Sequence, residues 1–471
     1  MTLPTTRPLH RRALVFSAAC WALLLNACAP LPQQVSQPVT QSAVPPAVPP
    51  AVVPALVPAP SAAAPADEAL RQRTRAEVPA MLATLESLVG IESGSRDLEG
   101  LTRLAQTVAD RLRASGMQVE LKPSKAADFH PTLKGAALGP MVYATRSGSG
   151  AKKVLLIAHM DTVYPRGMAA KQPFRIDGDR VYGLGVADDK QGVALILHTV
   201  ELLAKSGFAE YAQLGVLING DEEIGSPGSS AFITQLGSEY DAVFSFEGGG
   251  SAAATGGDMV RLATSSTASV EMKVTGKASH AGAAPQLGRN AIYELAHQML
   301  KSRNFGDPAK GLQINWTIAS GGGVSNVIPA EARAVGDVRS LNERDLDLME
   351  AALKKSIEDK LIPDTQIELN FRRGRPAFVA NAAAHALARH AVQVYGEIGM
   401  KIEIRDRATG GGTDAAYAGL RPKGGVLESF GLRGFGSHSN DSEYILASNI
   451  APRLYLATRM VMDMGRGRVI W

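Results

Sequence analysis

Short apolar runs alternate with amphipathic stretches along most of the chain. The runs at residues 152–161 (KKVLLIAHMD), 212–223 (AQLGVLINGDEE) and 240–249 (YDAVFSFEGG) each end in polar residues. The stretches at residues 98–116 and 190–207 repeat apolar positions with the period of a helix. This alternation predicts an α/β domain with a doubly wound, mostly parallel sheet. In such sheets the site lies at the carboxyl ends of the strands, where these runs carry their acids and histidine.

The pattern changes between residues 267 and 374, where it reads strand, helix, two strands, helix and strand. Residues 268–277 (ASVEMKVTGK) alternate apolar and polar side chains, as a half-exposed antiparallel strand does. Asn342 is a plausible cap for the second helix. We expect a smaller, ferredoxin-like α/β sandwich here, inserted into a first domain that comprises residues 67–266 and 375–471.

The chain begins with a secretory pattern. Three arginines and a histidine precede an apolar stretch that is too short for a comfortable membrane span and ends in LNAC at residues 25–28. This ending resembles the lipobox of bacterial lipoproteins, in which Cys28 would be lipidated; ordinary signal cleavage beside an incidental cysteine is the alternative. Residues 29–66, rich in Pro and Ala, predict an extended tether. We therefore expect an exported protein, lipid-anchored on the periplasmic face of the cell envelope, at the outer membrane.

Composition and charge limit the number of domains, the classes of partner and the use of cysteine. The 471 residues suffice for two or three domains, and 45% apolar with 20% charged residues is ordinary for a globular protein. A net charge of +4 without a long basic run argues against nucleic acid as a partner. Membrane contact is expected only through the N-terminal lipid. Both cysteines, Cys20 and Cys28, lie in the leader, so the body has no thiol for a disulfide or a metal.

Histidines and acids gather at the run ends and in Gly-rich loops. They form a His-x-Asp at residues 159–161, an Asp-Asp at 188–189, three acids at 221–223, a strand-end Glu247, and His438 in GFGSHSND. Imidazole and carboxylate groups, one of them bridging, are the ligands that a dinuclear metal hydrolase needs. The pattern predicts such a centre.

Five segments give this pattern a family resemblance. AHMDTVYPRG, GLGVADDKQG, NGDEEIGSPGS, GKASHAGAAPQLGRNA and TGGGTDAAYA resemble the signatures of the M20 family of dizinc exopeptidases. Within it, the chain is most similar to the bacterial glutamate carboxypeptidases that cleave folates, from about Leu70 to Met464. The resemblance implies two Zn²⁺ ions per subunit, and the implied ligands are His159, Asp188 as the bridge, Glu223, Glu247 and His438.

The resemblance also implies the acid–base groups. Glu222 would be the general base and acid, taking a proton from water and passing it to the leaving amine. Adjacent residues of an extended segment point opposite ways, so Glu223 can bind a metal while Glu222 faces the substrate. Asp161 would accept a hydrogen bond from a ligand imidazole and fix its tautomer. Asp221 has no implied role, and we expect it to support the turn.

A homodimer follows from the same resemblance. His280, in the inserted domain, would reach the neighbouring subunit's site and stabilise the oxyanion there, helped by Asn326. The active site would then be a shared product of two subunits.

Three features concern the substrate. The resemblance implies that Arg339 and Arg375 match positions that hold a substrate carboxylate in the glutamate carboxypeptidases, and a carboxylate suits the two parallel donors of a guanidinium. Gly411 and Gly412, in a Gly-rich loop, would let backbone amides approach the C-terminal end of a small peptide or N-acyl amino acid.

The stretch after Glu247 departs from the family. It is longer and richer in Gly than expected, and it offers Met259 and Arg261 where relatives recognise the glutamate side chain. Arg261 could meet an acidic side chain, and Met259 could line an apolar pocket.

From the ligand set and the resemblance together we predict a zinc-dependent exopeptidase that releases a C-terminal amino acid, first of all glutamate, from N-acyl or peptidyl substrates such as folates. An M20 aminoacylase or dipeptidase is the alternative. A non-catalytic peptide-binding lipoprotein is a distant one, because none of the five ligands is missing.

Overall fold

The computed structural model describes residues 65–126, 133, 135–249, 257–439 and 441–471. The predicted signal peptide, Cys28 and nearly all of the predicted tether lie outside these residues. Within the described ranges, no helix is both long and apolar enough to cross a membrane.

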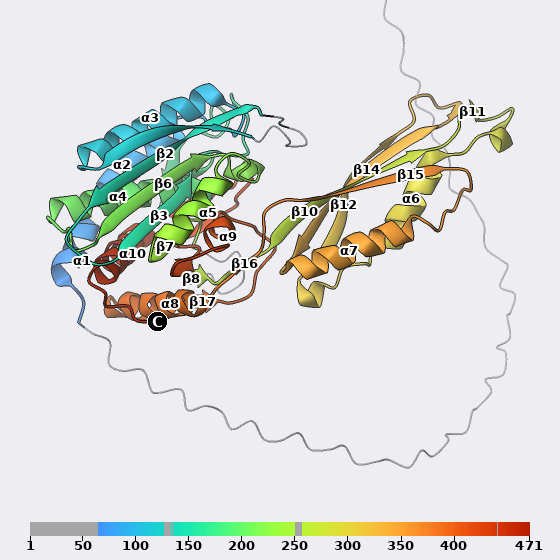
Figure 1. The fold of residues 1–471 in the computed structure, drawn as a ribbon. Helices are drawn as coiled ribbons and strands as arrows, with labels where there is room; N and C mark the ends of the chain where they lie inside the picture. The colour runs from blue at the N-terminus through green and yellow to red at the C-terminus, as the bar shows by residue number, and fades with distance from the viewer. Residues whose placement is uncertain (1–64, 127–132, 134, 250–256, 440) are drawn as a thin grey trace, which may run out of the picture. The chain divides into compact units, whose positions relative to one another are not determined.

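The main sheet has six strands in the order β1-β2-β6-β3-β7-β18 (Figure 1). Their bounds are Gln118–Lys125, Ala137–Ser147, Gln213–Gly220, Lys153–His159, Ala242–Ser245 and Gly425–Leu427, in that order. Strands β6, β3, β7 and β18 are parallel, whereas β1 and β2 are antiparallel to their neighbours. The sheet is therefore mixed, and the prediction of a mostly parallel sheet missed the hairpin β1–β2 at its edge. A short connection can join only antiparallel strands, because a parallel pair needs a crossover.

Helices cover both faces of this sheet. Val154 and Leu156 of β3 belong to one buried cluster, whereas Leu155 and Ile157 belong to another, as the alternation of a strand requires. The first cluster includes residues of α1 (Glu68–Ala76), α2 (Val78–Val89), α3 (Leu98–Ala114), α4 (Gln191–Lys205), α8 (Ala382–Glu397) and α10 (Ile450–Gly465). The second includes residues of α5 (Ser230–Glu239) and α9 (Ala415–Ala418). This is a three-layer α/β/α arrangement.

A second sheet has the strand order β12-β14-β10-β15, all antiparallel. Its elements follow the predicted order: β10 (Ser266–Thr275), α6 (Ala291–Ser302), β12 (Gln313–Gly321), β14 (Glu331–Ser340), α7 (Glu343–Ser356) and β15 (Gln366–Arg373). Val270 of β10 packs in a cluster with α7, and Met272 packs in one with α6. Residues two apart share a strand face, so both helices cover the same face. Asn342 accepts a hydrogen bond from the Asp345 amide and caps α7.

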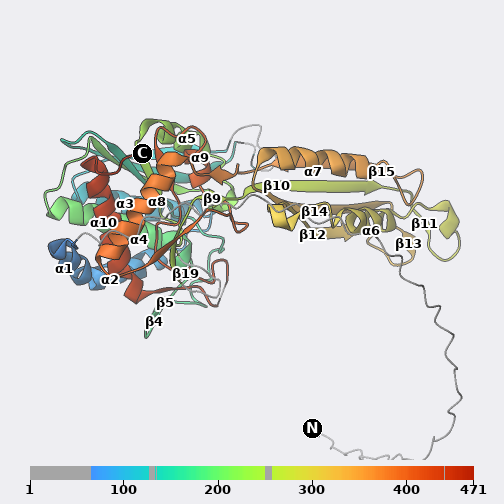
Figure 2. The ribbon, with the colours of Figure 1, turned by 90° about the horizontal axis from the view of Figure 1, so that it is seen from below.

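Short elements complete the described part (Figure 2). Four strands form a sheet in the order β19 (Gly434–Phe435), β20 (Tyr444–Leu446), β5 (Arg180–Tyr182) and β4 (Arg175–Asp177). The remaining pairs are β8 (Asp258–Arg261) with β17 (Ile402–Arg405), β9 (Ala263–Thr264) with β16 (Phe378–Val379), and β11 (Ser279–His280) with β13 (Val327–Ile328). Single helical turns span Glu222–Ile224, Pro285–Leu287, Pro308–Lys310 and Ala447–Asn449. Val186–Lys190 is an irregular turn in which the backbone angles of Asp188 and Asp189 are not helical.

Candidate metal centre

The first half of the centre surrounds His159, the buried last residue of β3. Its Nε2 lies 3.1 Å from Oδ1 of Asp188 and 3.5 Å from Oε1 of Glu247. Asp189 also offers an oxygen near His159 and Glu247, but its Oδ1 accepts a hydrogen bond of 2.6 Å from Gln191. One imidazole and two carboxylates therefore converge where β3 and β7 end.

The second half surrounds His438. Its Nε2 lies 3.4 Å from Oδ2 of Asp188 and 3.1 Å from Oε2 of Glu223. One oxygen of Asp188 thus faces His159 and the other faces His438. The five residues expected to bind metal come together in two groups that share one carboxylate.

The donor set fits divalent cations. Oε1 of Glu223 is buried and has no hydrogen-bond partner among the described residues. Within the same ranges, no Lys or Arg nitrogen is paired within 4.0 Å of the carboxylates of Asp188, Glu223 or Glu247. Burial raises the pKa of Glu223, and it raises that of Glu247 well above its usual value. Buried carboxylates at such close range need a compensating cation to stay ionised, and imidazole with carboxylate is a donor set that zinc prefers.

Asp161 links the first histidine to the Glu-Glu pair. Its Oδ1 accepts a hydrogen bond of 3.0 Å from the Glu222 amide, and its Oδ2 accepts one of 3.1 Å from the Glu223 amide. Nδ1 of His159 lies 3.3 Å from Asp161 Oδ1 and 3.1 Å from the Asp161 carbonyl oxygen. The buried carboxylate therefore holds the imidazole with Nε2 toward the centre, and it holds the backbone that presents both glutamates.

Glu222 is buried and lies against Arg375. Its Oε1 is 2.8 Å from Nη1 of Arg375. Burial raises the pKa of Glu222 to about 8, although the guanidinium opposes this shift. Arg375 is only 6% exposed, and it also donates to the Glu222 carbonyl at 2.8 Å, to Ser226 Oγ at 3.1 Å and to the Gly412 carbonyl at 2.9 Å. The guanidinium expected to hold a substrate carboxylate is thus engaged with the expected general base.

Asp221 supports the turn, as expected from the sequence. Its Oδ2 accepts hydrogen bonds from the amides of Gly228 at 2.7 Å and Ser229 at 3.1 Å. Its Oδ1 accepts from Ser229 Oγ at 2.6 Å. These bonds close the loop that follows Glu222 and Glu223.

A cleft extends from four of the expected metal ligands, Asp188, Glu223, Glu247 and His438, to the other residues expected to meet the substrate. Arg339, Gly411 and Gly412 all line it. Nε and Nη2 of Arg339 donate to Asp337 at 2.9 and 3.0 Å, and Nη1 donates to the Gly410 carbonyl at 3.2 Å. Arg339 therefore has an internal carboxylate partner.

His280 and Asn326 do not belong to this cleft. His280 pairs with Val327 across β11 and β13, and its side chain is exposed. Its Nδ1 accepts from the amides of Gly282 at 3.2 Å and Ala283 at 3.0 Å. Within one chain, the described structure does not bring His280 or Asn326 to the metal ligands.

Glu443 is a site residue that the sequence did not reveal. Its Oε1 accepts from the amides of Ala187 at 2.8 Å and Asp188 at 3.1 Å. Its Oε2 lies 2.7 Å from the hydroxyl of Tyr164, which is also 3.0 Å from the carbonyl of Ser439, the neighbour of His438. Glu443 and Tyr164 thus join the loops of Asp188 and His438. The only signal was an acid five positions after His438, which a surface loop would equally show.

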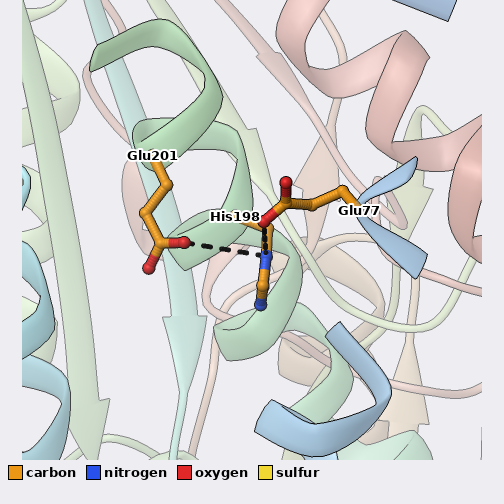
Figure 3. Close-up of side chains that lie close together, drawn as sticks. All are labelled: Glu77, His198 and Glu201. Atoms are coloured by element: carbon orange, nitrogen blue, oxygen red, sulfur yellow. Dashed lines mark hydrogen bonds and ion pairs between the residues drawn. The ribbon is translucent and has the colours of Figure 1, made fainter. Parts of the chain in front are cut away.

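A third cluster of histidine and carboxylates lies between helices, with Nδ1 of His198 2.8 Å from Glu77 and 3.8 Å from Glu201 (Figure 3). Here both carboxylates already have cationic partners. Arg111 Nη2 is 2.5 Å from Glu201 Oε1, and Lys205 Nζ is 3.3 Å from Glu77 Oε1. This cluster is a network of ion pairs that joins α3 and α4 to the residue between α1 and α2.

Comparisons with known proteins agree with the geometry. The model of peptidase family M20/M25/M40 matches residues 155–463. The chain belongs to this family. It is 44% identical to carboxypeptidase G2 from Pseudomonas sp. (strain RS-16) over 402 residues, which cover 85% of this chain and 93% of the relative. It is 29% identical to a succinyl-diaminopimelate desuccinylase from Stenotrophomonas maltophilia (strain R551-3), over 57% of this chain and 73% of the relative.

Solved structures share the fold. The metallo-carboxypeptidase Sso-CP2 from Sulfolobus solfataricus has a TM-score of 0.66 at 16% identity and covers 82% of this chain and 99% of its own. Human carnosine dipeptidase 1 has a TM-score of 0.66 at 15% identity and covers 85% of this chain and 98% of its own. The family and enzyme class predicted from the sequence are confirmed: the chain is an M20 metallopeptidase similar to carboxypeptidase G2.

Proposed function

We propose that this M20 enzyme is a zinc-dependent exopeptidase that releases a C-terminal amino acid, first of all glutamate, from N-acyl or peptidyl substrates such as folates. The observation that carries the proposal is the placement of Asp188, whose two oxygens face two separate histidines. Similarity to carboxypeptidase G2 supports the choice of a C-terminal residue.

Five residues would hold two zinc ions. His159 and Glu247 would bind one ion, His438 and Glu223 the other, and Asp188 both. When bound, zinc supplies Lewis acidity and lowers the pKa of water to about 7.

The other buried residues act around the reacting bond. Glu222 takes a proton from the attacking water and later donates it to the leaving nitrogen. Asp161 fixes the backbone of Glu222, so the carboxylate keeps its place beside the ligands. Arg375, between Glu222 and the carbonyl of Gly412, orients the substrate's terminal carboxylate together with the loop of Gly411. Its Nε has no partner within the described ranges.

We also propose that His280 and Asn326 act on the neighbouring subunit of a homodimer. Helix α6 and the edge strand β12 support this proposal, because Tyr293, Leu300 and Ile318 on them are large, apolar and exposed. An exposed sheet edge with apolar side chains beside it favours pairing with another chain. Export and a lipid anchor at Cys28 rest on the sequence pattern of the leader.

A substrate profile tests the proposal. The purified, zinc-loaded protein is incubated with N-acyl amino acids, dipeptides and folates, with and without a chelator, and the products are identified by mass spectrometry. We expect chelator-sensitive release of a C-terminal amino acid, most rapidly glutamate. Absence of hydrolysis across the whole panel would contradict the proposal.

A further inference from the structure

Arg453, in the first half of α10, is a completely buried cation, with 0% of its surface exposed. Its Nε lies 3.2 Å from Oδ1 of Asp258, the first residue of β8. Removing such a pair of charges from water costs free energy that their attraction often fails to return, and apolar side chains of similar volume are commonly as stable. The ion pair alone therefore gives no reason for an arginine at this position.

The remaining donors of Arg453 bind the backbone. Nη2 donates to the carbonyl of Gly249 at 2.7 Å and to that of Met259 at 3.0 Å, and Nη1 donates to that of Ser429 at 3.4 Å. These carbonyls belong to segments that are far apart in the sequence. A guanidinium can reach all of them and the carboxylate at once, because its five N–H groups are spread over three nitrogens in a fixed plane.

Two of these segments border the cleft, and one of them carries an expected metal ligand. Gly249 lies two residues after Glu247, and both Glu247 and Ser429 line the cleft. The segments are also joined directly, since the amide of Gly431 donates to the Glu247 carbonyl at 2.9 Å. Arg453 donates to a carbonyl of each segment and therefore fixes the two against one another beside Glu247.

Gly249 is shaped for this contact. A Cβ at that position would lie 2.5 Å from Nη2 of Arg453 and 2.5 Å from the Gly431 carbonyl oxygen, closer than such atoms can approach. A Cβ on Gly248 would meet nothing closer than 3.7 Å. Of the two glycines that follow Glu247, only the second is thus required by the guanidinium. This gives a physical reason for part of the Gly-rich stretch in which the chain departs from its family.

We propose that Arg453 is a positioning residue for Glu247. Its guanidinium holds the backbone of residues 247–249, so that the carboxylate stays directed at Nε2 of His159, 3.5 Å away. This inference rests on the proposed zinc-dependent function, in which His159 and Glu247 bind one of two ions. Among the described residues, no hydrogen bond or ion pair joins Arg453 to His438 or to the residues beside it, so the other half-site should not depend on this contact.

The test measures zinc affinity in the absence of substrate. Arg453→Lys keeps a cation beside Asp258 but cannot donate to all three carbonyls, and Gly249→Ala keeps the arginine but displaces it from the backbone. Competition with a chromogenic chelator gives the affinities of the two ions. In each variant we expect one ion to bind about 10- to 100-fold more weakly, the usual effect of removing a residue that orients a ligand, and the other to keep its wild-type affinity.

Two control variants separate positioning from a general loss of stability. Gly248→Ala adds the same methyl group one residue nearer to Glu247, where there is room for it, and should leave both affinities unchanged. Arg459→Gln removes another arginine of α10, which pairs with Glu397 at 3.4 Å. It should lower the free energy of unfolding, measured in urea, without changing either affinity.

Removing one histidine at a time shows which ion is affected. His438→Ala leaves the half-site of His159 and Glu247, and adding Arg453→Lys to this variant should weaken the remaining ion. His159→Ala leaves the half-site of His438, and adding Arg453→Lys there should change nothing.

Two results would overturn the inference: unchanged affinity for both ions in Arg453→Lys and Gly249→Ala, or equal weakening of both ions. If Arg453→Lys failed to fold, Gly249→Ala would decide alone, because it retains the pair of Arg453 with Asp258. A wild type that bound fewer than two zinc ions would contradict both the inference and the proposed centre. Failure of the exopeptidase function alone is a different result: the wild type would bind two ions and hydrolyse nothing, and the affinities would still decide the role of Arg453.

Discussion

Two regions of the molecule combine histidine with carboxylates, and they differ in how the charge is balanced. In the helical network, Arg111 and Lys205 neutralise the acids around His198. The carboxylates of Asp188 and Glu247 also lie close to a histidine, His159. Among the described residues, however, no Lys or Arg pairs with either of them. The residue types are therefore alike, but only the second region has negative charge left for a metal ion.

The histidines also differ in what their nitrogens contact. Nδ1 of His198 is 2.8 Å from Glu77 and Nε2 is 2.8 Å from Thr84 Oγ1, so both are used within the network. In His159, Nδ1 contacts Asp161, and Nε2 is directed at Asp188 and Glu247. A metal ligand needs one nitrogen fixed by the protein and the other directed at the ion.

Removing the carboxylate of Asp188, which faces both histidines, should have the largest effect on the centre. We expect Asp188→Asn to lose metal from both half-sites and to lower turnover to background, because each half-site keeps only one histidine and one glutamate. Elemental analysis of the purified variant and a hydrolysis assay measure the two effects. A variant that retained a full metal complement would show that Asp188 is not the bridge.

Glu222→Gln should separate chemistry from metal binding. We expect both metal ions to remain and kcat to fall about 10²- to 10⁴-fold, the usual contribution of a general base. The same elemental analysis provides the control. A large loss of zinc would place Glu222 among the ligands instead.

Glu443→Gln tests whether the loop of Asp188 needs its buried anchor. The amide side chain cannot accept from Ala187, Asp188 and Tyr164 together as the carboxylate does, so we expect metal affinity to fall about 10- to 100-fold, as for other residues that orient ligands. Competition with a chromogenic chelator measures the affinity. Glu397→Gln removes a comparable partner of a tyrosine, 2.7 Å from Tyr455, and should leave metal affinity unchanged.

His198→Gln should affect stability alone. We expect the free energy of unfolding to fall by about 1–3 kcal/mol, the cost of leaving buried polar partners unsatisfied, with unchanged metal content and kcat. Urea unfolding and elemental analysis distinguish the two regions. Loss of zinc from this variant would contradict the assignment of the cluster as an ion-pair network.

The pH dependence of stability also tests the role of His198 in the helical network. Burial lowers the pKa of His198, although Glu77 opposes the shift. As pH falls below about 6.5, the usual value for histidine, the unfolded chain binds a proton that the folded chain does not, so the folded state loses stability. Unfolding curves between pH 5 and 8, in the range where histidine titrates, should show this loss in the wild type and a smaller one in His198→Gln.

The sequence predicted the parts of the fold that depend on local pattern. The runs that became β3, β6 and β7, and the order of elements from β10 to β15, follow from short-range periodicity. The hairpin β1–β2 was missed. Helices α1 and α2 are divided at Glu77, with Pro79 in the first turn of α2. A helical period alone does not show where a helix is interrupted.

The site was predictable to the extent that its residues end strands or share family motifs. Of the expected ligands, His159, Glu223 and Glu247, with Asp161, lie near one another because β3, β6 and β7 are parallel and end at one edge of the sheet. Asp188 and His438 reach the same place from loops outside these strands. Glu443 was not predictable, because its partner Asp188 lies 255 positions away in the sequence. Nor does a motif show that Arg375 is paired with Glu222, since this depends on the packing of two distant loops.

The position of Asp161 has a consequence for how such an enzyme can diversify. One carboxylate sets the orientation of an expected metal ligand and the backbone of the residue expected to move the proton, so these two parts of the site are expected to shift together. Arg339, on another wall of the cleft, is not among its partners. A substitution on that wall is therefore expected to leave Asp161, His159 and the Glu222 backbone in place, which is the separation a protein engineer would need in order to retarget the enzyme.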